Sequence, residues 1–227
     1  MNSIMNQIKG GLIVSCQALE HEPLHSAEIM ARMAYAAKLG GAVGIRANSV
    51  VDIKAIKEKV DLPLIGIIKK DYPDSKIFIT ATMEEVDALV EAGCEIIATD
   101  ATCRTRPNGE SLDEFFKKVR EKYPNQLFMA DCATFEEGMH AAEIGFDFIG
   151  TTLSGYTEES KGAVLPNYQM MERLVKEAGK PVIAEGGIWS PEQLKKALDL
   201  GVLSAVVGTA ITRPMEITQY FIKAISN

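Results

Sequence analysis

The sequence contains few residues of the kinds that hold metal ions. Its 227 residues include four cysteines and three histidines, and no two cysteines have the C-x-x-C spacing of zinc or redox motifs. Cys16, Cys94 and Cys132 lie in or beside apolar runs, which is typical of reduced residues in a core. The histidines lack the spacing of metal ligands. The sequence therefore predicts no metal site.

The chain also lacks the features of proteins that bind nucleic acids or membranes. Acidic residues outnumber basic ones by 31 to 24, and the formal net charge is −7. We expect no nucleic-acid partner, because binding to a phosphate backbone usually needs a basic face. No apolar run is long enough to span a bilayer, and the N-terminus lacks the pattern of a signal peptide. We therefore expect no membrane partner and a cytoplasmic location.

What the sequence does contain is a series of short, continuously apolar runs. These runs differ from the alternating pattern of a half-exposed strand, and they are typical of strands buried on both faces of a parallel sheet. The runs lie at residues 12–17, 42–47, 63–69, 95–101, 126–132, 146–154, 181–187 and 204–210.

Segments with helical periodicity alternate with these runs. Thr82 and Ser111 each precede a glutamate at the spacing of a capping box, and Ser190 precedes a proline at the first helical position. Ser49 and Thr134 are two further expected N-caps. The predicted helices lie at 27–40, 49–60, 82–93, 111–123, 134–145, 167–179, 190–201 and 214–225.

The strict alternation of strands and helices predicts the α/β class. The main alternative to a barrel is an open, doubly wound sheet, which usually carries a G-x-G-x-x-G motif after its first strand. Here the first run ends in Ser-Cys-Gln. Eight compact strand–helix units suit a closed barrel of this length. We therefore predict α/β architecture in the form of a single (β/α)8 TIM barrel, with one domain over residues 1–227.

Function in such a barrel is located at the carboxyl ends of the strands. Lys69 follows an apolar segment, where loss of solvent would lower its pKa and make the neutral amine available as a base or nucleophile. Glu185 follows another such segment and could act as an acid or base. The alternatives are that Lys69 extends into solvent beside Lys70, and that Glu185 pairs with a basic side chain. Other polar residues near strand ends are Gln17, Arg46, Asp100, Asp131, Thr151, Thr152 and Ser154.

Two glycine-containing segments after the last two strands suggest a phosphate site. Barrels often bind phosphate there through backbone N–H groups at the start of a short helix. Gly186 and Gly187 end the seventh run, and Gly208 and Thr209 lie near the end of the eighth. Arg213 would add positive charge. The alternative is that both segments are ordinary glycine turns.

Several strings of residues, spread over most of the chain, carry a more specific signal. They are GGLIVSCQ (10–17), EPLH (22–25), AVGIRA (42–47), LIGIIK (64–69), TDAT (99–102), RPNGE (106–110), MADC (129–132), TTLSGYT (151–157), VIAEG (182–186) and AVVGTAITRP (205–214). In these strings the chain resembles the N-acylglucosamine-6-phosphate 2-epimerases, also called N-acetylmannosamine-6-phosphate 2-epimerases, of sialic acid catabolism. The resemblance implies conversion of N-acetylmannosamine 6-phosphate to N-acetylglucosamine 6-phosphate, with no metal and no organic cofactor.

The resemblance also implies roles for individual residues. Lys69 and Glu185 match the catalytic positions of the family. Gly187 departs from the pattern, because some members carry arginine there, so backbone amides and Arg213 would carry more of the phosphate binding. Gln17, Arg46 and Asp131 match substrate-contacting positions of the family. Thr152 and Ser154, which lie near a strand end, are added to the predicted substrate contacts. The predicted phosphate contacts are Gly186, Gly187, Gly208, Thr209 and Arg213.

These residues suggest a mechanism based on proton transfer. After the sugar ring opens, Lys69 would remove the proton at C2, Glu185 would assist proton movement at the oxygens, and Arg46 would steady the developing charge. Inversion at C2 needs either two bases or one base and a reoriented intermediate, and both routes are open. Two other classes are a class I aldolase that uses Lys69 as a Schiff-base nucleophile, and a phosphosugar-binding protein without catalysis.

The last predicted helix is unusually apolar for a helix on the outside of one barrel. Its apolar residues are Ile217, Tyr220, Phe221, Ile222 and Ile225. We expect this helix to mediate a homodimer, and the alternative is that it packs against its own barrel.

Overall fold

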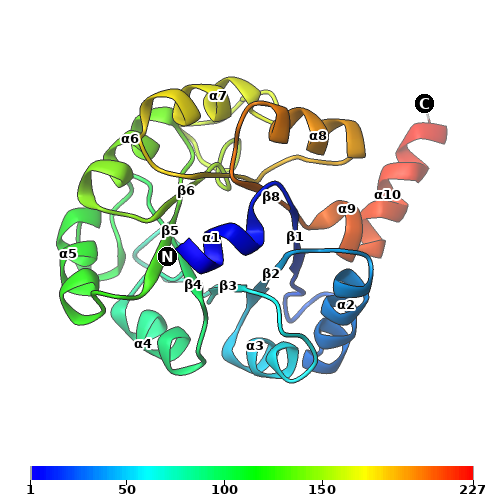
Figure 1. The fold of residues 1–227 in the computed structure, drawn as a ribbon, viewed down its shortest axis with the longest axis horizontal. Helices are drawn as coiled ribbons and strands as arrows, with labels where there is room; N and C mark the ends of the chain where they lie inside the picture. The colour runs from blue at the N-terminus through cyan, green and yellow to red at the C-terminus, as the bar shows by residue number, and fades with distance from the viewer. Residues whose placement is uncertain (1, 227) are drawn as a thin grey trace.

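Eight parallel strands pair in chain order and close into a barrel within residues 2–226, the part of the chain that the computed structural model describes (Figure 1). The last strand pairs with the first, with Leu12 opposite Ala205. This arrangement confirms the predicted (β/α)8 barrel. The strands are β1 (Leu12–Cys16), β2 (Gly44–Asn48), β3 (Leu64–Ile67), β4 (Ile96–Asp100), β5 (Leu127–Asp131), β6 (Phe148–Gly150), β7 (Val182–Ala184) and β8 (Ser204–Val207).

Helices surround the barrel, and five of them begin at the predicted caps, Ser49, Thr82, Ser111, Thr134 and Ser190. The side chains of Thr134 and Ser111 each accept a hydrogen bond from the backbone N–H three residues later. This capping satisfies N–H groups that have no partner inside the helix. The surrounding helices are α2 (Ala27–Leu39), α3 (Val50–Lys57), α4 (Met83–Glu91), α5 (Leu112–Lys122), α6 (Phe135–Ile144), α7 (Tyr168–Glu177) and α8 (Pro191–Asp199), and a short 3-10 turn (η1) covers Pro107–Gly109.

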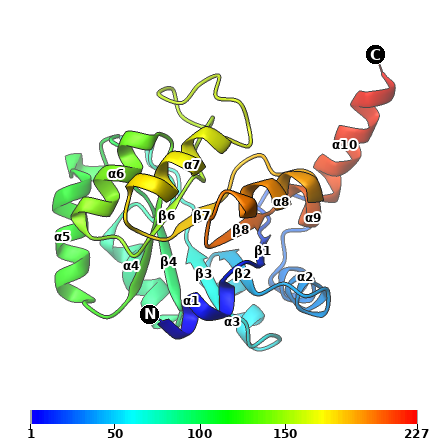
Figure 2. The same ribbon diagram turned by 45° about the horizontal axis from the view of Figure 1, so that its top comes forward.

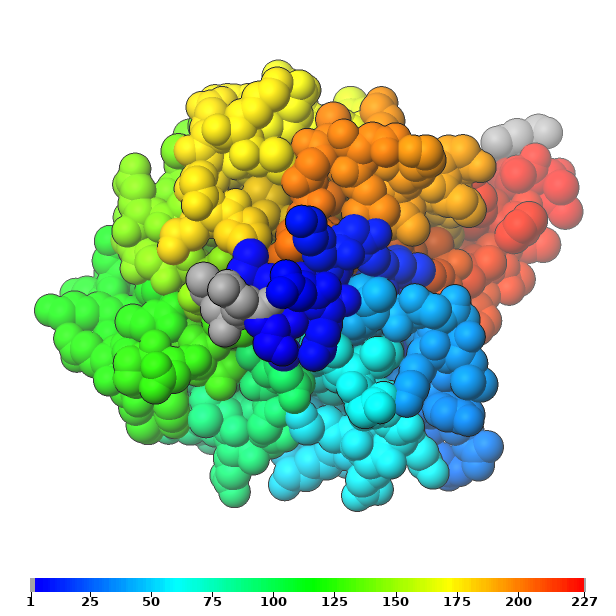
Figure 3. Space-filling model, viewed as in Figure 1, coloured from blue at the N-terminus to red at the C-terminus, as the bar shows by residue number. Residues whose placement is uncertain are grey.

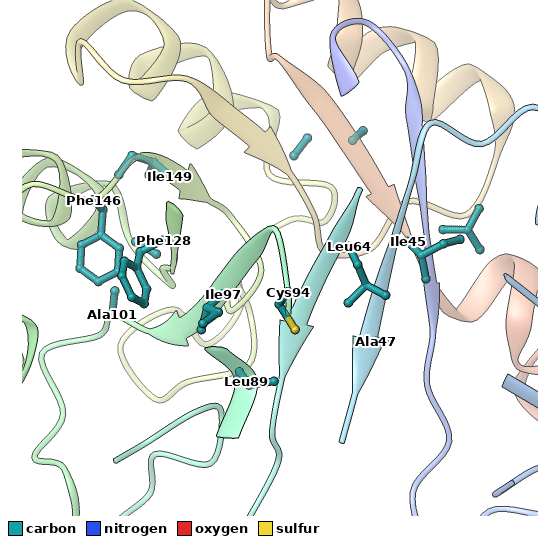
Figure 4. Packing of buried hydrophobic residues seen from close by; sticks show 14 of the residues in the cluster. Ile45, Ala47, Leu64, Leu89, Cys94, Ile97, Ala101, Phe128, Phe146 and Ile149 are labelled. Atoms are coloured by element: carbon teal, nitrogen blue, oxygen red, sulfur yellow. The ribbon is translucent and has the colours of Figure 1, made fainter. Parts of the chain in front are cut away.

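The strands are buried on both faces, which explains why their sequences are continuously apolar. Ile65 and Phe148 belong to an inner cluster that fills the barrel. Leu64 and Ile149 belong to an outer cluster between the strands and the helices, part of which is shown in Figure 4. Because neighbouring residues of a strand point to opposite faces, both residues of each pair must be apolar.

The amino-terminal end of the barrel is covered by a helix that the sequence patterns did not predict. This helix, α1 (Asn2–Ile8), lies across the centre of the barrel in Figure 1 and covers the same face in the space-filling view (Figure 3). Ile8 is only 1% exposed and packs in the inner cluster, with Ile4 and Met5 beside it. The open end of the barrel is therefore the carboxyl end of the strands.

The chain ends in two helices after β8. The short α9 (Thr209–Thr212), also missed from sequence, is followed by α10 (Pro214–Ile225), which extends away from the barrel (Figure 2). None of the α10 residues that the structure describes is buried, and its main contacts are with α9. Within residues 2–226, no helix combines the length and the apolar character needed to cross a bilayer.

Candidate active site

A buried ion pair forms the base of the candidate site. Arg46 on β2 donates two parallel hydrogen bonds to the carboxylate of Asp131 on β5, at 3.1 and 2.6 Å. The two side chains are 1% and 0% exposed, respectively. Each charge is out of water, so each needs the other to remain stable in the barrel. The two-pronged geometry suits arginine, whose planar fork matches a carboxylate.

Glu185 lies above this pair, immediately after β7. Arg46 Nη1 is 3.1 Å from its Oε2 atom, and the hydroxyl of Thr152 donates hydrogen bonds to both Asp131 and Glu185, at 2.6 and 3.3 Å. Burial raises the pKa of Glu185, and the charge of Asp131 acts in the same direction, whereas Arg46 opposes the shift. A raised pKa makes the conjugate carboxylate a stronger base than an ordinary glutamate.

Lys69 completes the group from the end of β3. Burial lowers the pKa of Lys69 to about 8, and the positive charge of Arg46 adds to the decrease. The structure therefore gives Lys69 the lowered pKa that its apolar sequence context predicted. An amine with such a pKa is partly neutral at physiological pH and can accept a proton.

Lys69, Thr152 and Glu185 line a pocket at the carboxyl end of the barrel with a volume of about 570 Å³. Its walls contain the two predicted catalytic residues, two of the predicted substrate contacts and all five predicted phosphate contacts. The predicted residues in the lining are Gln17, Lys69, Thr152, Glu185, Gly186, Gly187, Gly208, Thr209 and Arg213. The carboxyl ends of distant strands therefore bring members of all three predicted groups into one cavity.

The predicted phosphate contacts in the pocket offer mainly backbone N–H groups and few charged side chains. Gly186 and Gly187 have φ values of +103° and +73°, which residues with a Cβ rarely adopt. Gly208 is the N-cap of α9, whose first N–H groups have no partner inside the helix. Arg213 is held by two carboxylates, with Nη2 2.8 Å from Glu22 and 2.7 Å from Glu216.

Three predicted substrate contacts are not in the pocket lining. Arg46 and Asp131 lie beneath it, so that Thr152 and Glu185 separate them from the cavity. Ser154 is 1% exposed and accepts a hydrogen bond from the amide of Asn167, at 2.9 Å. The geometry therefore gives Arg46 and Asp131 a supporting place under Glu185. Contact of Arg46, Asp131 and Ser154 with substrate stays a prediction.

The lining also includes residues that the sequence patterns did not single out. Trp189 stacks on Tyr220 of α10 with 4.9 Å between ring centroids, and both rings border the pocket. The position of Trp189, two residues after the paired glycines, was a usable signal because it shares their loop. Glu22 begins the string EPLH, but its ion pair with Arg213 joins distant parts of the chain and was not predicted.

No metal-binding group is formed by the side chains within residues 2–226, where no three or more His, Cys, Asp or Glu residues are suitably grouped. The nearest acidic pair, Asp131 and Glu185, already shares Arg46 and Thr152. The prediction that the reaction needs neither metal nor organic cofactor stays a prediction.

Comparison with known proteins identifies the family. Residues 30–227 match the family described as "Putative N-acetylmannosamine-6-phosphate epimerase". This chain belongs to that family. A relative from Caldanaerobacter subterraneus subsp. tengcongensis, described as "Putative N-acetylmannosamine-6-phosphate 2-epimerase", is 55% identical over 222 residues, which cover 98% of this chain and 94% of the relative. A relative from Enterobacter sp. (strain 638) with the same description is 54% identical and covers 99% of this chain and 97% of its own length.

A solved structure agrees with this membership of the epimerase family. The N-acetylmannosamine-6-phosphate 2-epimerase from Clostridium perfringens superposes with a TM-score of 0.93 at 55% identity, over 97% of this chain and 96% of that one. The thiamine phosphate pyrophosphorylase from Pyrococcus furiosus superposes with a TM-score of 0.62 at 17% identity, over 92% and 89% of the two chains. The second match indicates a shared fold alone. The predicted family and the predicted barrel are both confirmed.

Proposed function

We propose that this chain converts N-acetylmannosamine 6-phosphate to N-acetylglucosamine 6-phosphate by removing the proton at C2 and returning it to the opposite face. One observation carries the assignment of residues: Lys69, with a pKa of about 8, and Glu185, with a raised pKa, line the same pocket. Family membership supports the reaction, which belongs to the isomerase class and to the catabolism of amino sugars, including sialic acid.

The proposed reaction begins when the sugar ring opens and exposes an aldehyde at C1, next to the C2–H bond. The neutral amine of Lys69 takes the C2 proton and becomes an ammonium, and the electrons of that bond move into an enolate with its charge on the C1 oxygen. Glu185 moves protons at the sugar oxygens. Arg46 acts through Glu185, because it lies 3.1 Å from that carboxylate and beneath the pocket. Return of a proton to the other face of C2 completes the inversion.

We propose that the phosphate group of the substrate binds to the part of the pocket lining that contains the predicted phosphate contacts. Backbone N–H groups near Gly186, Gly187 and at the start of α9 support this placement, since bare amides suit a phosphate oxygen. Arg213 adds one guanidinium whose Nε and Nη2 atoms already bind Glu22, so its Nη1 atom is the donor we assign to phosphate. Binding at this end would hold C2 near Lys69.

The test is epimerisation in D2O followed by NMR at the C2 proton, without added metal, with Lys69→Met and Glu185→Gln alongside. We expect the wild type to form the gluco epimer with deuterium at C2, and each variant to lose at least about 10²-fold in rate. A folded wild type that neither epimerises nor exchanges C2 would overturn the proposal. Borohydride trapping of substrate on Lys69 would instead indicate the Schiff base of an aldolase.

We also propose that the chain forms a homodimer in which α10 packs on the second copy. Tyr220, Phe221, Ile222 and Ile225 are between 53% and 79% exposed. A helix with this many exposed apolar side chains next to one another indicates an interface. A second copy fits best, because α10 follows β8 where a helix would normally cover the barrel wall, and it extends outward instead (Figure 2).

Sedimentation or light scattering tests the dimer directly. We expect twice the mass of one chain for the wild type, and a shift toward one chain for Phe221→Asp, which places a charge in the proposed interface. A wild type that stays monomeric at micromolar concentration would rule the dimer out. The cytoplasmic location that we expect from the sequence also remains a prediction.

A further inference from the structure

The backbone of Lys69 lies just beyond the end of a strand ladder. The parallel pairing of β2 with β3 ends where Asn48 is opposite Ile67. Two residues later, the N–H of Lys69 donates a hydrogen bond to the side-chain oxygen of Asn48, at 2.8 Å. A side chain thus takes the place of the carbonyl that a longer β2 would offer.

Asn48 holds Lys69 without belonging to the pocket. It is 8% exposed, and it lies on β2 two residues after Arg46, but it is not among the residues that line the cavity. Its oxygen therefore contacts the backbone of Lys69 rather than a molecule bound in the pocket. Asn48 therefore acts on the reaction through Lys69 rather than through the substrate.

The segment after β3 fixes the same peptide from its other side. The N–H of Thr80 donates to the carbonyl of Ile68 at 2.7 Å, and the N–H of Ile68 donates to the Thr80 hydroxyl at 3.2 Å. Thr80 has a φ of +45°, an unfavourable conformation for a β-branched residue. Strained backbone is retained where surrounding contacts determine it and often lies near functional sites. Lys69 is thus held between Asn48 and the Thr80 segment.

The other proposed catalytic residue has an anchor of the same kind. The hydroxyl of Thr151, immediately after β6, donates to the carbonyl of Glu185 at 2.8 Å and accepts from its N–H at 3.0 Å. Thr151 is fully buried and also lies outside the pocket lining. Each residue thus lies just past its strand and is held by a side chain of the preceding strand segment.

We propose that Asn48 is a positioning residue that fixes the backbone of Lys69 and thereby aims its amine at C2 of the substrate. The proposal rests on the role of Lys69 as the base under Proposed function. An amide suits this place because it accepts the hydrogen bond without carrying charge. Aspartate would offer the same acceptor, but its negative charge would favour the ammonium form of Lys69 and raise its pKa.

Two substitutions separate the acceptor from the charge. Asn48→Ala removes the acceptor, and we expect kcat to fall about 10- to 100-fold while KM changes less than about threefold, because Asn48 does not line the pocket. Asn48→Asp keeps the acceptor. The wild-type rate rises with pH as Lys69 loses its proton, and Asn48→Asp should move the midpoint of that rise to higher pH. At pH values above the new midpoint, kcat of Asn48→Asp should lie within about threefold of the wild-type value. Asn125→Asp, on the exposed turn before β5, should leave the midpoint unchanged.

The outcomes are distinguishable. Wild-type kcat in Asn48→Ala, or equal loss in Asn48→Ala and Asn48→Asp at every pH, would overturn the positioning role. If Asn48→Ala does not fold, as judged by circular dichroism, Asn48→Asp decides alone. Restored kcat at high pH supports the positioning role, and a loss of more than about tenfold there overturns it. Failure of the proposed function itself would appear in a different experiment, as full activity of Lys69→Met.

Discussion

Leu165 packs against the backbone of Gly187 so closely that a side chain at position 187 would overlap it. A Cβ atom built on Gly187 would lie 2.5 Å from the Cβ of Leu165. Leu165 belongs to the connection between β6 and α7, which rises over the carboxyl end of the barrel (Figure 2). The β6–α7 connection therefore rests on a glycine of the predicted phosphate site.

Gly187→Ala should therefore impair both stability and phosphate binding. The positive φ of +73° and the overlap with Leu165 together should cost about 1–3 kcal/mol of unfolding free energy. Displacement of one phosphate contact should raise KM about tenfold. Gly179→Ala is a matched control, because Gly179 also has a positive φ, of +64°, but has nothing within 4 Å of its Cβ position. Equal effects in the two variants would show that the contact with Leu165 does not matter.

Arg46→Met should destabilise the barrel and inactivate the enzyme. It would leave the buried carboxylates of Asp131 and Glu185 without their shared partner, and removal of one member of a buried pair costs about 3–5 kcal/mol. Urea unfolding measures the loss. Arg32→Met removes an exposed pair with Glu28 on α2 and should leave the midpoint of unfolding unchanged. Similar midpoints for both variants would contradict the structural role of Arg46.

Lys69→Met should stabilise the fold at neutral pH while abolishing activity. Because the folded pKa of about 8 lies below the ordinary value of 10.5, the unfolded chain binds more protons between these values, and stability of the wild type rises with pH there. Below about pH 8 Lys69 is charged in the folded state, and the full free-energy cost of burying its ammonium group lowers the stability. The gain in Tm should thus be largest at pH 7 and shrink toward pH 10.5. The exposed neighbour provides the control, Lys70→Met. A gain independent of pH would argue against the lowered pKa.

Thr151→Val should lower kcat without changing KM. The substitution keeps the shape of the side chain but removes the hydroxyl that holds both backbone groups of Glu185. We expect a fall of about 10- to 100-fold in kcat, because small displacements of a catalytic group are costly. Steady-state kinetics and circular dichroism measure the two effects, with the exposed Thr105→Val as control. Wild-type kcat in a folded Thr151→Val variant would contradict the anchoring role.

The barrel could be predicted because its local signals agree with one another. Continuous apolar runs, the capping residues at the starts of helices and the alternation of the two element types are properties of short segments. The helix α1 could not be predicted in this way. Ile8 is buried because it closes the inner cluster, a tertiary contact that leaves no periodic pattern in a seven-residue helix. The same holds for α9, whose four residues gain their place from the end of β8.

The site was predicted in part for a geometric reason. Any polar residue at the carboxyl end of a barrel strand points toward one shared opening, so Lys69 and Glu185 could be placed together from sequence. The same rule placed Ser154 at the opening, whereas the structure buries it beside Asn167. The rule gives the end of the barrel but not the depth of each side chain.

The sequence by itself determined the fold class, the order of its elements, the family and the two residues proposed to move the proton, because each depends on local patterns or on contiguous strings. The tertiary structure decided which charges meet. Arg46 and Asp131 are 85 residues apart and pair across the barrel interior. Asn48 reaches Lys69 only because β2 and β3 are neighbours whose ends are paired, with Asn48 opposite Ile67. Such contacts depend on distances between strands, which no single segment of the chain encodes.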